Sequence, residues 1–131
     1  AGLLAPLVRE GRVIHGGYVT NRAAYRRLLA RVDIAVSTAR HEFFGVGVVE
    51  SIAAGAWPLL PERLAYPEIL PKRFHSEHLY RTENQLRVKL RSAIVRLSRT
   101  RAAELSRSVA RFDWPRMIGR YDRALQRAAE D

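Results

Sequence analysis

The sequence contains no cysteine, no long apolar run and few acidic residues. Without cysteine, disulfide bonds and thiolate metal sites are excluded. No run of about 18 apolar residues occurs, so no membrane-spanning helix is expected. Residues 1–6 are too short a segment, and lack the basic group, for a signal peptide. These absences are compatible with a cytoplasmic protein, and we expect that location.

The shortage of acidic residues leaves the chain strongly basic. Its 131 residues include 23 Lys and Arg against 13 Asp and Glu, which gives a formal net charge of +10. The excess is concentrated in residues 81–127, where 13 Lys and Arg stand against four acidic residues. This asymmetry indicates a polyanionic partner, either nucleic acid or an acidic membrane surface. The alternative is a solvated, arginine-rich surface.

Short apolar runs alternate with helical patterns in the first two-thirds of the chain. This alternation predicts an α/β fold, with a Rossmann-like parallel sheet and flanking helices, in a single domain over residues 1–131. The expected strands cover residues 12–15, 33–37, 57–61 and 78–80. Helices are expected after an Asn21 cap, over residues 46–54 before a C′ Gly55, and from Pro67 onward.

The last third, residues 81–131, changes to basic helices. An apolar stripe at helical spacing marks the first of them, through Leu86, Leu90, Ala93, Ile94 and Leu97. A second helix is expected over residues 101–111, and a third begins near Asp113 and Pro115. Four arginines recur every three or four residues on the third helix, and they indicate either nucleic-acid contact or a solvated face: Arg116, Arg120, Arg123 and Arg127.

The segment from Glu42 to Glu50 places two carboxylates around two glycines, between a predicted strand and a predicted helix. Ligands of open parallel sheets bind beyond the carboxyl ends of the strands. The start of the helix offers unpaired amides that suit a diphosphate, at Gly45, Val46, Gly47 and Val48. Glu50 can accept hydrogen bonds from a ribose diol, and Glu42 can contact the transferred sugar or stabilise positive charge on it. The alternative is an acid favoured near a helix start, with glycines that only form turns.

No pattern in the sequence supplies metal ligands. It has no Asp-x-Asp pair, and His15, His75 and His78 lack the spacing of metal ligands. We therefore expect neither a metal nor another cofactor. Helix amides and Arg or Lys side chains would then stabilise the charge of a leaving diphosphate.

Three stretches resemble the C-terminal lobe of retaining glycosyltransferases of the two-lobed GT-B fold: residues 13–19, 32–37 and 42–58. The last stretch carries the Glu-x7-Glu signature, followed by an Ala-x-Ala-x-Gly-like helix end at residues 51–55. Residues 37–45 and 60–68 are similar, more narrowly, to the tRNA-queuosine mannosyltransferase group. That similarity depends on the Phe43-Phe44 pair and on the Arg-Leu-x-Tyr-Pro-Glu string, which are not general to the superfamily.

The resemblance implies a role for individual residues. Glu42 would be the catalytic residue facing the donor sugar, while Gly45 to Val48 would bind the diphosphate and Glu50 the ribose. The other donor-binding candidates lie at the base pocket, beside Glu42 or after the next strand: Gly17, Tyr18, Val19, Ser37, His41, Phe44 and Glu68. A structural role in the loop is equally open for His41. The implied donor is GDP-mannose, and the implied acceptor is a queuosine-modified tRNA.

Two parts of the family pattern have no counterpart in this sequence. They are the first strand–helix unit of the lobe, with its diphosphate-binding Arg and Lys, and the entire N-terminal acceptor lobe. We therefore expect the chain to be part of a longer enzyme and to be inactive alone. Two alternatives remain, a transferase acting on envelope glycans or lipids and a non-catalytic nucleic-acid-binding domain on a degenerate transferase lobe. The intact Glu42 and Glu50 argue against degeneracy.

Overall fold

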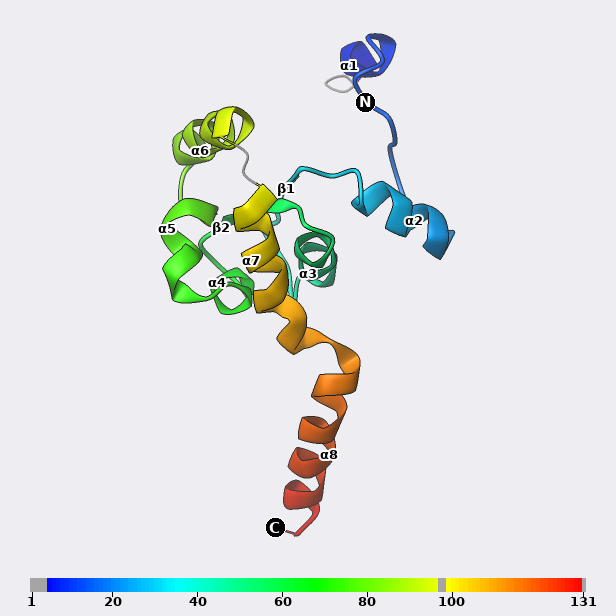
Figure 1. The fold of residues 1–131 in the computed structure, drawn as a ribbon, viewed down its shortest axis with the longest axis vertical. Helices are drawn as coiled ribbons and strands as arrows, with labels where there is room; N and C mark the ends of the chain where they lie inside the picture. The colour runs from blue at the N-terminus through cyan, green and yellow to red at the C-terminus, as the bar shows by residue number, and fades with distance from the viewer. Residues whose placement is uncertain (1–4, 97–98, 131) are drawn as a thin grey trace.

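A computed structural model describes residues 5–96 and 99–130, and Figure 1 shows their arrangement. Three parallel strands form the sheet, in the spatial order β1-β2-β3: β1 (Ile34–Val36), β2 (Trp57–Pro61) and β3 (Leu79–Tyr80). Ile34 lies level with Trp57, and Leu60 with Leu79. Helices flank the sheet, so the predicted α/β class and parallel sheet are confirmed. The arrangement is consistent with a Rossmann-like fold.

The central strand β2 is buried along its whole length. Its side chains alternate between two apolar clusters, because successive residues of a strand point to opposite faces. Leu60 joins one cluster with residues of α3 (Val46–Ala53), α4 (Tyr66–Ile69) and α7 (Arg99–Val109). Trp57 and Leu59 join the other cluster with Ala93 of α6 (Glu83–Arg96). Both faces of the sheet are therefore covered, as the continuous apolar run of β2 predicts.

Pro58 lies in this central strand, although proline cannot donate a hydrogen bond to a neighbouring strand. The amide of Trp57 donates to Asp33 beside β1, so the next residue, Pro58, faces the β3 side. β3 begins only at the level of Leu60. Below it, the buried ring of His78 donates from Nδ1 to the Pro58 carbonyl over 2.8 Å. Pro58 therefore lies where the described sheet has no neighbouring strand that would accept a hydrogen bond from its backbone nitrogen.

The N-terminal part differs from the expectation in one element. Residues 12–15 form no strand and lie in the connection between α1 (Ala5–Arg9) and α2 (Arg22–Leu29), where Ile14 is 69% exposed. Val13 and Ile14 are its two apolar side chains, and they bury too little surface to hold this segment against the sheet. The start of α2 is as predicted, because Asn21 Oδ1 accepts from the amide of Ala24 at 2.9 Å.

The helices after β1 largely follow the predictions. α3 ends just before Gly55, whose φ of +100° is typical of a C′ glycine, and α4 carries Pro67 in its first turn. His78 was expected in a strand but closes α5 (His75–His78), which follows a 3-10 turn (Lys72–Phe74). On α6, Ile94 is 64% exposed, so the predicted apolar stripe was one residue too wide. Leu97 lies outside the described residues.

After α7, a 3-10 turn (Ala110–Phe112) leads into α8 (Trp114–Glu130), which extends away from the sheet (Figure 1). The carbonyl of Asp113 accepts from the amides of Arg116 and Met117 at 3.0 and 3.1 Å, so α8 begins where it was predicted to begin. None of the helices that the structure describes is long and apolar enough to cross a membrane.

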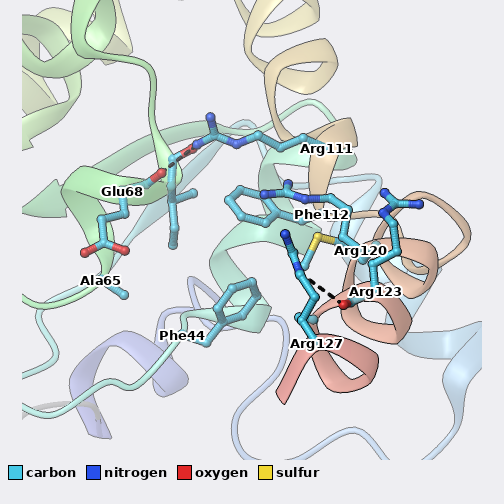
Figure 2. A pocket seen from close by; sticks show the side chains of 11 residues that line it. Phe44, Ala65, Glu68, Arg111, Phe112, Arg120, Arg123 and Arg127 are labelled. Atoms are coloured by element: carbon cyan, nitrogen blue, oxygen red, sulfur yellow. Dashed lines mark hydrogen bonds between the residues drawn. The ribbon is translucent and has the colours of Figure 1, made fainter. Parts of the chain in front are cut away.

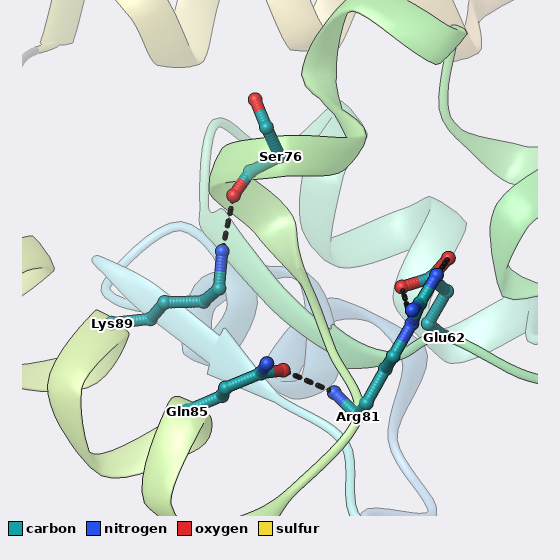
Figure 3. A network of polar contacts seen from close by, with 5 residues as sticks. All are labelled: Glu62, Ser76, Arg81, Gln85 and Lys89. Carbon is teal, nitrogen blue, oxygen red and sulfur yellow. Dashed lines mark hydrogen bonds and ion pairs between the residues drawn. The ribbon is translucent and has the colours of Figure 1, made fainter.

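A polar network fastens α6 to the segments that follow β2 and β3 (Figure 3). Arg81, directly after β3, donates to both carboxylate oxygens of Glu62, directly after β2, at 2.7 and 2.8 Å. These hydrogen bonds hold the pKa of Glu62 below its ordinary value. The amide of Arg81 donates to Gln85, and Lys89 donates to the carbonyl of Ser76. The network therefore fixes the path of the chain where it leaves the carboxyl ends of the two strands.

A substitution at Leu105 tests the packing of α7 on α3, since the Leu105 side chain is fully buried in the cluster that contains Ile52. We expect Leu105→Ala to lower the free energy of unfolding by about 2–5 kcal/mol, because it removes buried apolar groups and leaves a cavity. Urea denaturation followed by circular dichroism measures this change. The control Val95→Ala alters a side chain that is 82% exposed, and should change stability by less than about 0.5 kcal/mol. Equal losses in the two variants would contradict the packing.

Candidate active site

The first turn of α3 begins at Gly45, which is buried and has a left-handed backbone with φ of +80°. Its carbonyl accepts from the amides of Val48 and Val49, each at 3.0 Å. The amide of Val48 was predicted to be unpaired, and this prediction was wrong because the turn closes one residue early. The amides of Gly45, Val46 and Gly47 donate to no group in the part of the chain that the structure describes. These three amides remain available to an anion.

Glu42 is held by its own loop. Its Oε1 accepts from the amides of Phe43 and Phe44 at 3.0 and 3.3 Å, and its side chain is half-buried. The neighbouring His41 and Phe43 are exposed, the latter completely. The ring of Phe44 is partly exposed and meets Phe112 edge-on, with 5.4 Å between ring centroids. The loop therefore presents the Glu42 carboxylate beside the start of α3.

Glu50 lies within α3 and contacts α2. Its Oε2 accepts a hydrogen bond of 2.9 Å from the hydroxyl of Tyr25. Burial raises the pKa of Tyr25, and the hydrogen bond and negative charge of Glu50 raise it further. Both residues open into a cavity of about 350 Å³, here called the tyrosine cavity, which is lined by Arg22, Tyr25, Arg26, Leu29, Glu50, Ala53 and Ala54. The residue predicted to bind a ribose thus lines a cavity together with two arginines.

No role in this site was predicted for Tyr25, Arg22 or Arg26. Helical periodicity places Tyr25 on the inner face of α2, but it does not say which residue of α3 that face meets. Tyr25 and Glu50 are 25 residues apart in the chain, and the hydrogen bond between their side chains joins the two helices.

Ser37 forms hydrogen bonds with other residues of the fold. Its hydroxyl lies 2.7 Å from that of the buried Tyr66, and its carbonyl accepts from the hydroxyl of Tyr80 at 2.6 Å. Burial raises the pKa of Tyr80. Two residues further along, the carbonyl of Ala39 accepts two hydrogen bonds from Arg63, at 2.9 and 3.2 Å. These contacts fix the start of the loop that leads to Glu42, and the predicted contact of Ser37 with a donor stays a prediction.

Gly17, Tyr18 and Val19 lie in the connection between α1 and α2. Tyr18 is 89% exposed, and the carbonyl of Gly17 is 3.1 Å from a ring nitrogen of His15. Figure 1 shows this connection leading from α2 out to α1, away from the sheet. The structure therefore does not bring these residues to the Glu42 loop, and their assignment to a base pocket stays a prediction.

A second and larger cavity, of about 640 Å³, lies between α8 and the loops at Phe44 and Ala65 (Figure 2). It is here called the arginine cavity. It brings Phe44 and Glu68, both predicted to bind a donor, together with three of the four arginines predicted to bind nucleic acid. The fourth, Arg116, is exposed on α8 outside it. Its lining consists of Phe44, Ala65, Glu68, Ile69, Arg111, Phe112, Met117, Arg120, Arg123, Ala124 and Arg127.

Arg111 and Phe112 build one wall of the arginine cavity, and sequence reasoning missed both. Arg111 Nη2 donates to the carbonyls of Glu68 and Ile69, at 2.5 and 3.0 Å, and its guanidinium lies 4.7 Å from the centre of the Phe112 ring. Arg111 therefore fastens α4 to the turn before α8. The cavity exists because these two segments, more than 40 residues apart in the chain, are joined there.

Metal-ligating groups do not converge in the described ranges, residues 5–96 and 99–130. No three His, Asp or Glu side chains there are placed to hold a metal ion. The expectation of a reaction without metal stays a prediction.

Comparison with known proteins finds similarity to curated proteins. The chain is 43% identical over 79 residues to a Drosophila melanogaster protein named tRNA-queuosine alpha-mannosyltransferase. The matched region is 60% of this chain but 20% of that protein, so the chain spans about one fifth of its relative's length. No protein-family model matches the chain, and no solved structure matches it.

The hydrogen bond between Tyr25 and Glu50 predicts a pH effect. The pKa of Tyr25 is raised in the folded state, so the neutral side chain stabilises the fold. This contribution to the free energy of unfolding is complete below a pH of about 10, and it is lost as the pH rises through the pKa of the folded state. NMR of tyrosine labelled with ¹³C at Cζ measures this pKa. We expect Glu50→Gln to lower it, because the negative charge is removed. The control Glu83→Gln, at an exposed residue of α6, should not. An unchanged Tyr25 pKa in Glu50→Gln would contradict the contact.

Proposed function

We propose that this chain is the donor-binding lobe of a retaining glycosyltransferase, which transfers mannose from GDP-mannose to queuosine in tRNA without a metal ion. The observation that carries this proposal is the segment around the start of α3, where three available amides follow Glu42 and precede Glu50. The similarity to a protein named tRNA-queuosine alpha-mannosyltransferase supports the choice of donor sugar and acceptor. In this proposal the chain works together with an N-terminal acceptor lobe of the same enzyme, in the cytoplasm.

The proposed reaction breaks the bond between the anomeric carbon of the sugar and the diphosphate, and the electron pair leaves with the diphosphate. Negative charge grows there, where the amides of Gly45, Val46 and Gly47 donate hydrogen bonds. Positive charge grows on the sugar ring, and the Glu42 carboxylate stabilises it. The acceptor hydroxyl forms the new bond to the anomeric carbon, and its proton passes to the departing diphosphate.

Glu50 would hold the ribose of the donor in this proposal. One of its oxygens accepts from Tyr25, which orients the carboxylate and leaves the other oxygen for a sugar hydroxyl. Arg22 and Arg26 line the same cavity as Glu50 and would add positive charge on that side of a bound donor. They would take the part of the upstream Arg and Lys that the resemblance to GT-B enzymes implies.

Thermal denaturation with GDP, UDP and ADP tests the donor site on this chain. We expect GDP to raise the melting temperature most. Glu50→Ala should weaken GDP binding by about tenfold or more, because a hydrogen bond to a charged group contributes about 1.5–3 kcal/mol. Glu42→Gln is the matched control: its amide oxygen can still accept from Phe43 and Phe44, and GDP carries no sugar for Glu42 to contact. Equal weakening by both substitutions, or no response to any nucleotide, would count against this site.

The acceptor is tested on the full-length protein that carries this sequence. It is incubated with tRNA and a panel of sugar nucleotides, and the digested nucleosides are analysed by mass. We expect a hexose on queuosine from GDP-mannose alone, and a loss of about 10²-fold or more in rate for Glu42→Gln, because an aligned charge near the transition state is removed. Hexose transfer to lipid or glycan, with none to any tRNA nucleoside, would rule out the tRNA acceptor.

A non-catalytic nucleic-acid-binding domain is the second candidate. The arginine cavity favours it, because its described lining residues include four arginines and one carboxylate, that of Glu68. Salt-sensitive binding of tRNA that Glu50→Ala does not change, without any binding of nucleotides, would select this candidate over the first.

A further inference from the structure

The arginine cavity has a strongly uneven distribution of charge. Arg120, Arg123 and Arg127 project from α8 on one side, and Figure 2 shows the Glu68 carboxylate on the opposite side, beyond Phe112. None of the ion pairs found among the described residues includes these three arginines. Their guanidinium groups are therefore positive charges without a described carboxylate partner, carried by the helix that forms one wall of the cavity. Such a wall binds phosphate groups well.

The spacing of these arginines favours a chain of phosphates over a single phosphate. Positions 120, 123 and 127 cover about 10 Å along a helix, since each residue adds about 1.5 Å. Arginines carried at intervals along that length match successive phosphates of a nucleic-acid strand better than one isolated phosphate. The cavity volume of about 640 Å³ also falls within the range typical of ligand sites, about 300–1,000 Å³.

The opposite wall offers an aromatic surface. Phe44 lines the cavity and remains 42% exposed, although its ring also contacts Phe112. An exposed ring beside arginines is the combination with which proteins bind unpaired bases, because bases stack on the ring while the phosphates are neutralised. A flat anionic membrane surface has no group that would use an aromatic wall inside a cavity.

We propose that the arginine cavity binds a single-stranded segment of RNA, with Arg120, Arg123 and Arg127 on successive phosphates and one base on Phe44. This site deepens the proposed function and rests on it for the identity of the RNA, since it gives a tRNA acceptor a place to bind. Arg111 is a positioning residue, because its side chain donates hydrogen bonds to two backbone carbonyls and so stabilises one wall of the cavity.

Fluorescence anisotropy with a labelled oligouridine measures this binding on the chain. We expect the triple variant R120A/R123A/R127A to raise Kd at least about tenfold and to reduce the slope of log Kd against log salt by about two, because three phosphate contacts are lost. The matched control R91A/R96A/R107A removes the same charge from exposed arginines of α6 and α7. Equal losses in the two variants would show a diffuse electrostatic attraction and overturn the proposal.

Single substitutions distinguish binding in the arginine cavity from binding to any arginine of α8. Arg123→Ala should cost more affinity than Arg116→Ala, which removes the same charge from α8 outside the cavity. Phe44→Leu keeps an apolar contact with Phe112 but should weaken RNA binding about fivefold or more, and Phe44→Tyr should restore it. Circular dichroism confirms folding of each variant. Equal effects of Arg123→Ala and Arg116→Ala, or no effect of Phe44→Leu, would overturn the proposal.

Two further ligands decide the class of partner. A fully paired RNA duplex of the same length should bind more weakly, because its bases are not free to stack on Phe44. Vesicles of equal parts phosphatidylcholine and phosphatidylserine should not compete with the oligouridine. Stronger binding to the vesicles, dependent on the same three arginines, would replace RNA by a membrane surface. RNA binding that needs the cavity supports this inference whether or not GDP binds, and absence of GDP binding counts only against the donor site.

Discussion

The arrangement of the candidate site depends on the backbone of Gly45. Its φ of +80° lies in the left-handed region, which other residue types adopt at a cost. A Cβ at this position would lie 3.0 Å from Cδ1 of Ile69 and 3.3 Å from Cε1 of Tyr66. Because Gly45 lacks that atom, α4 packs directly on the start of α3. The same turn joins the loop that carries Glu42 to the helix that carries Glu50.

Local signals predicted most of the fold correctly. The signals that were read correctly are local: the cap at Asn21, the helix end at Gly55 and the apolar run of β2. Each depends only on residues close to it in the chain, so the nearby sequence is enough to predict the element. The expected strand at residues 12–15 was wrong because a strand also needs a neighbour that accepts its hydrogen bonds. The wider helical stripe that included Ile94 was wrong because the width of a buried face is set by the partner surface.

The candidate site was predictable only where it is local. The segment from Glu42 to Glu50 was found because its carboxylates, its glycines and its helix start are adjacent in the chain. Tyr25, Arg111 and Phe112 were missed because each contributes through a contact between distant elements. For the same reason the arginines of α8 were predicted as one continuous stripe, whereas the fold of the segment before α8 divides Arg116 from the other three.

The aromatic contact between Phe44 and Phe112 has a thermodynamic consequence. Phe44 is two residues from Glu42, whose carboxylate accepts from the Phe44 amide, and it immediately precedes the residue that starts α3. One short loop is therefore a wall of the arginine cavity and the base of the helix that carries Glu50. A ligand that displaced this ring in the arginine cavity would also shift the first turn of α3. A ligand bound at that turn would, in the same way, shift the ring. Two such ligands would change each other's affinity by an equal factor, as linkage requires, and a single phenylalanine side chain would carry that coupling.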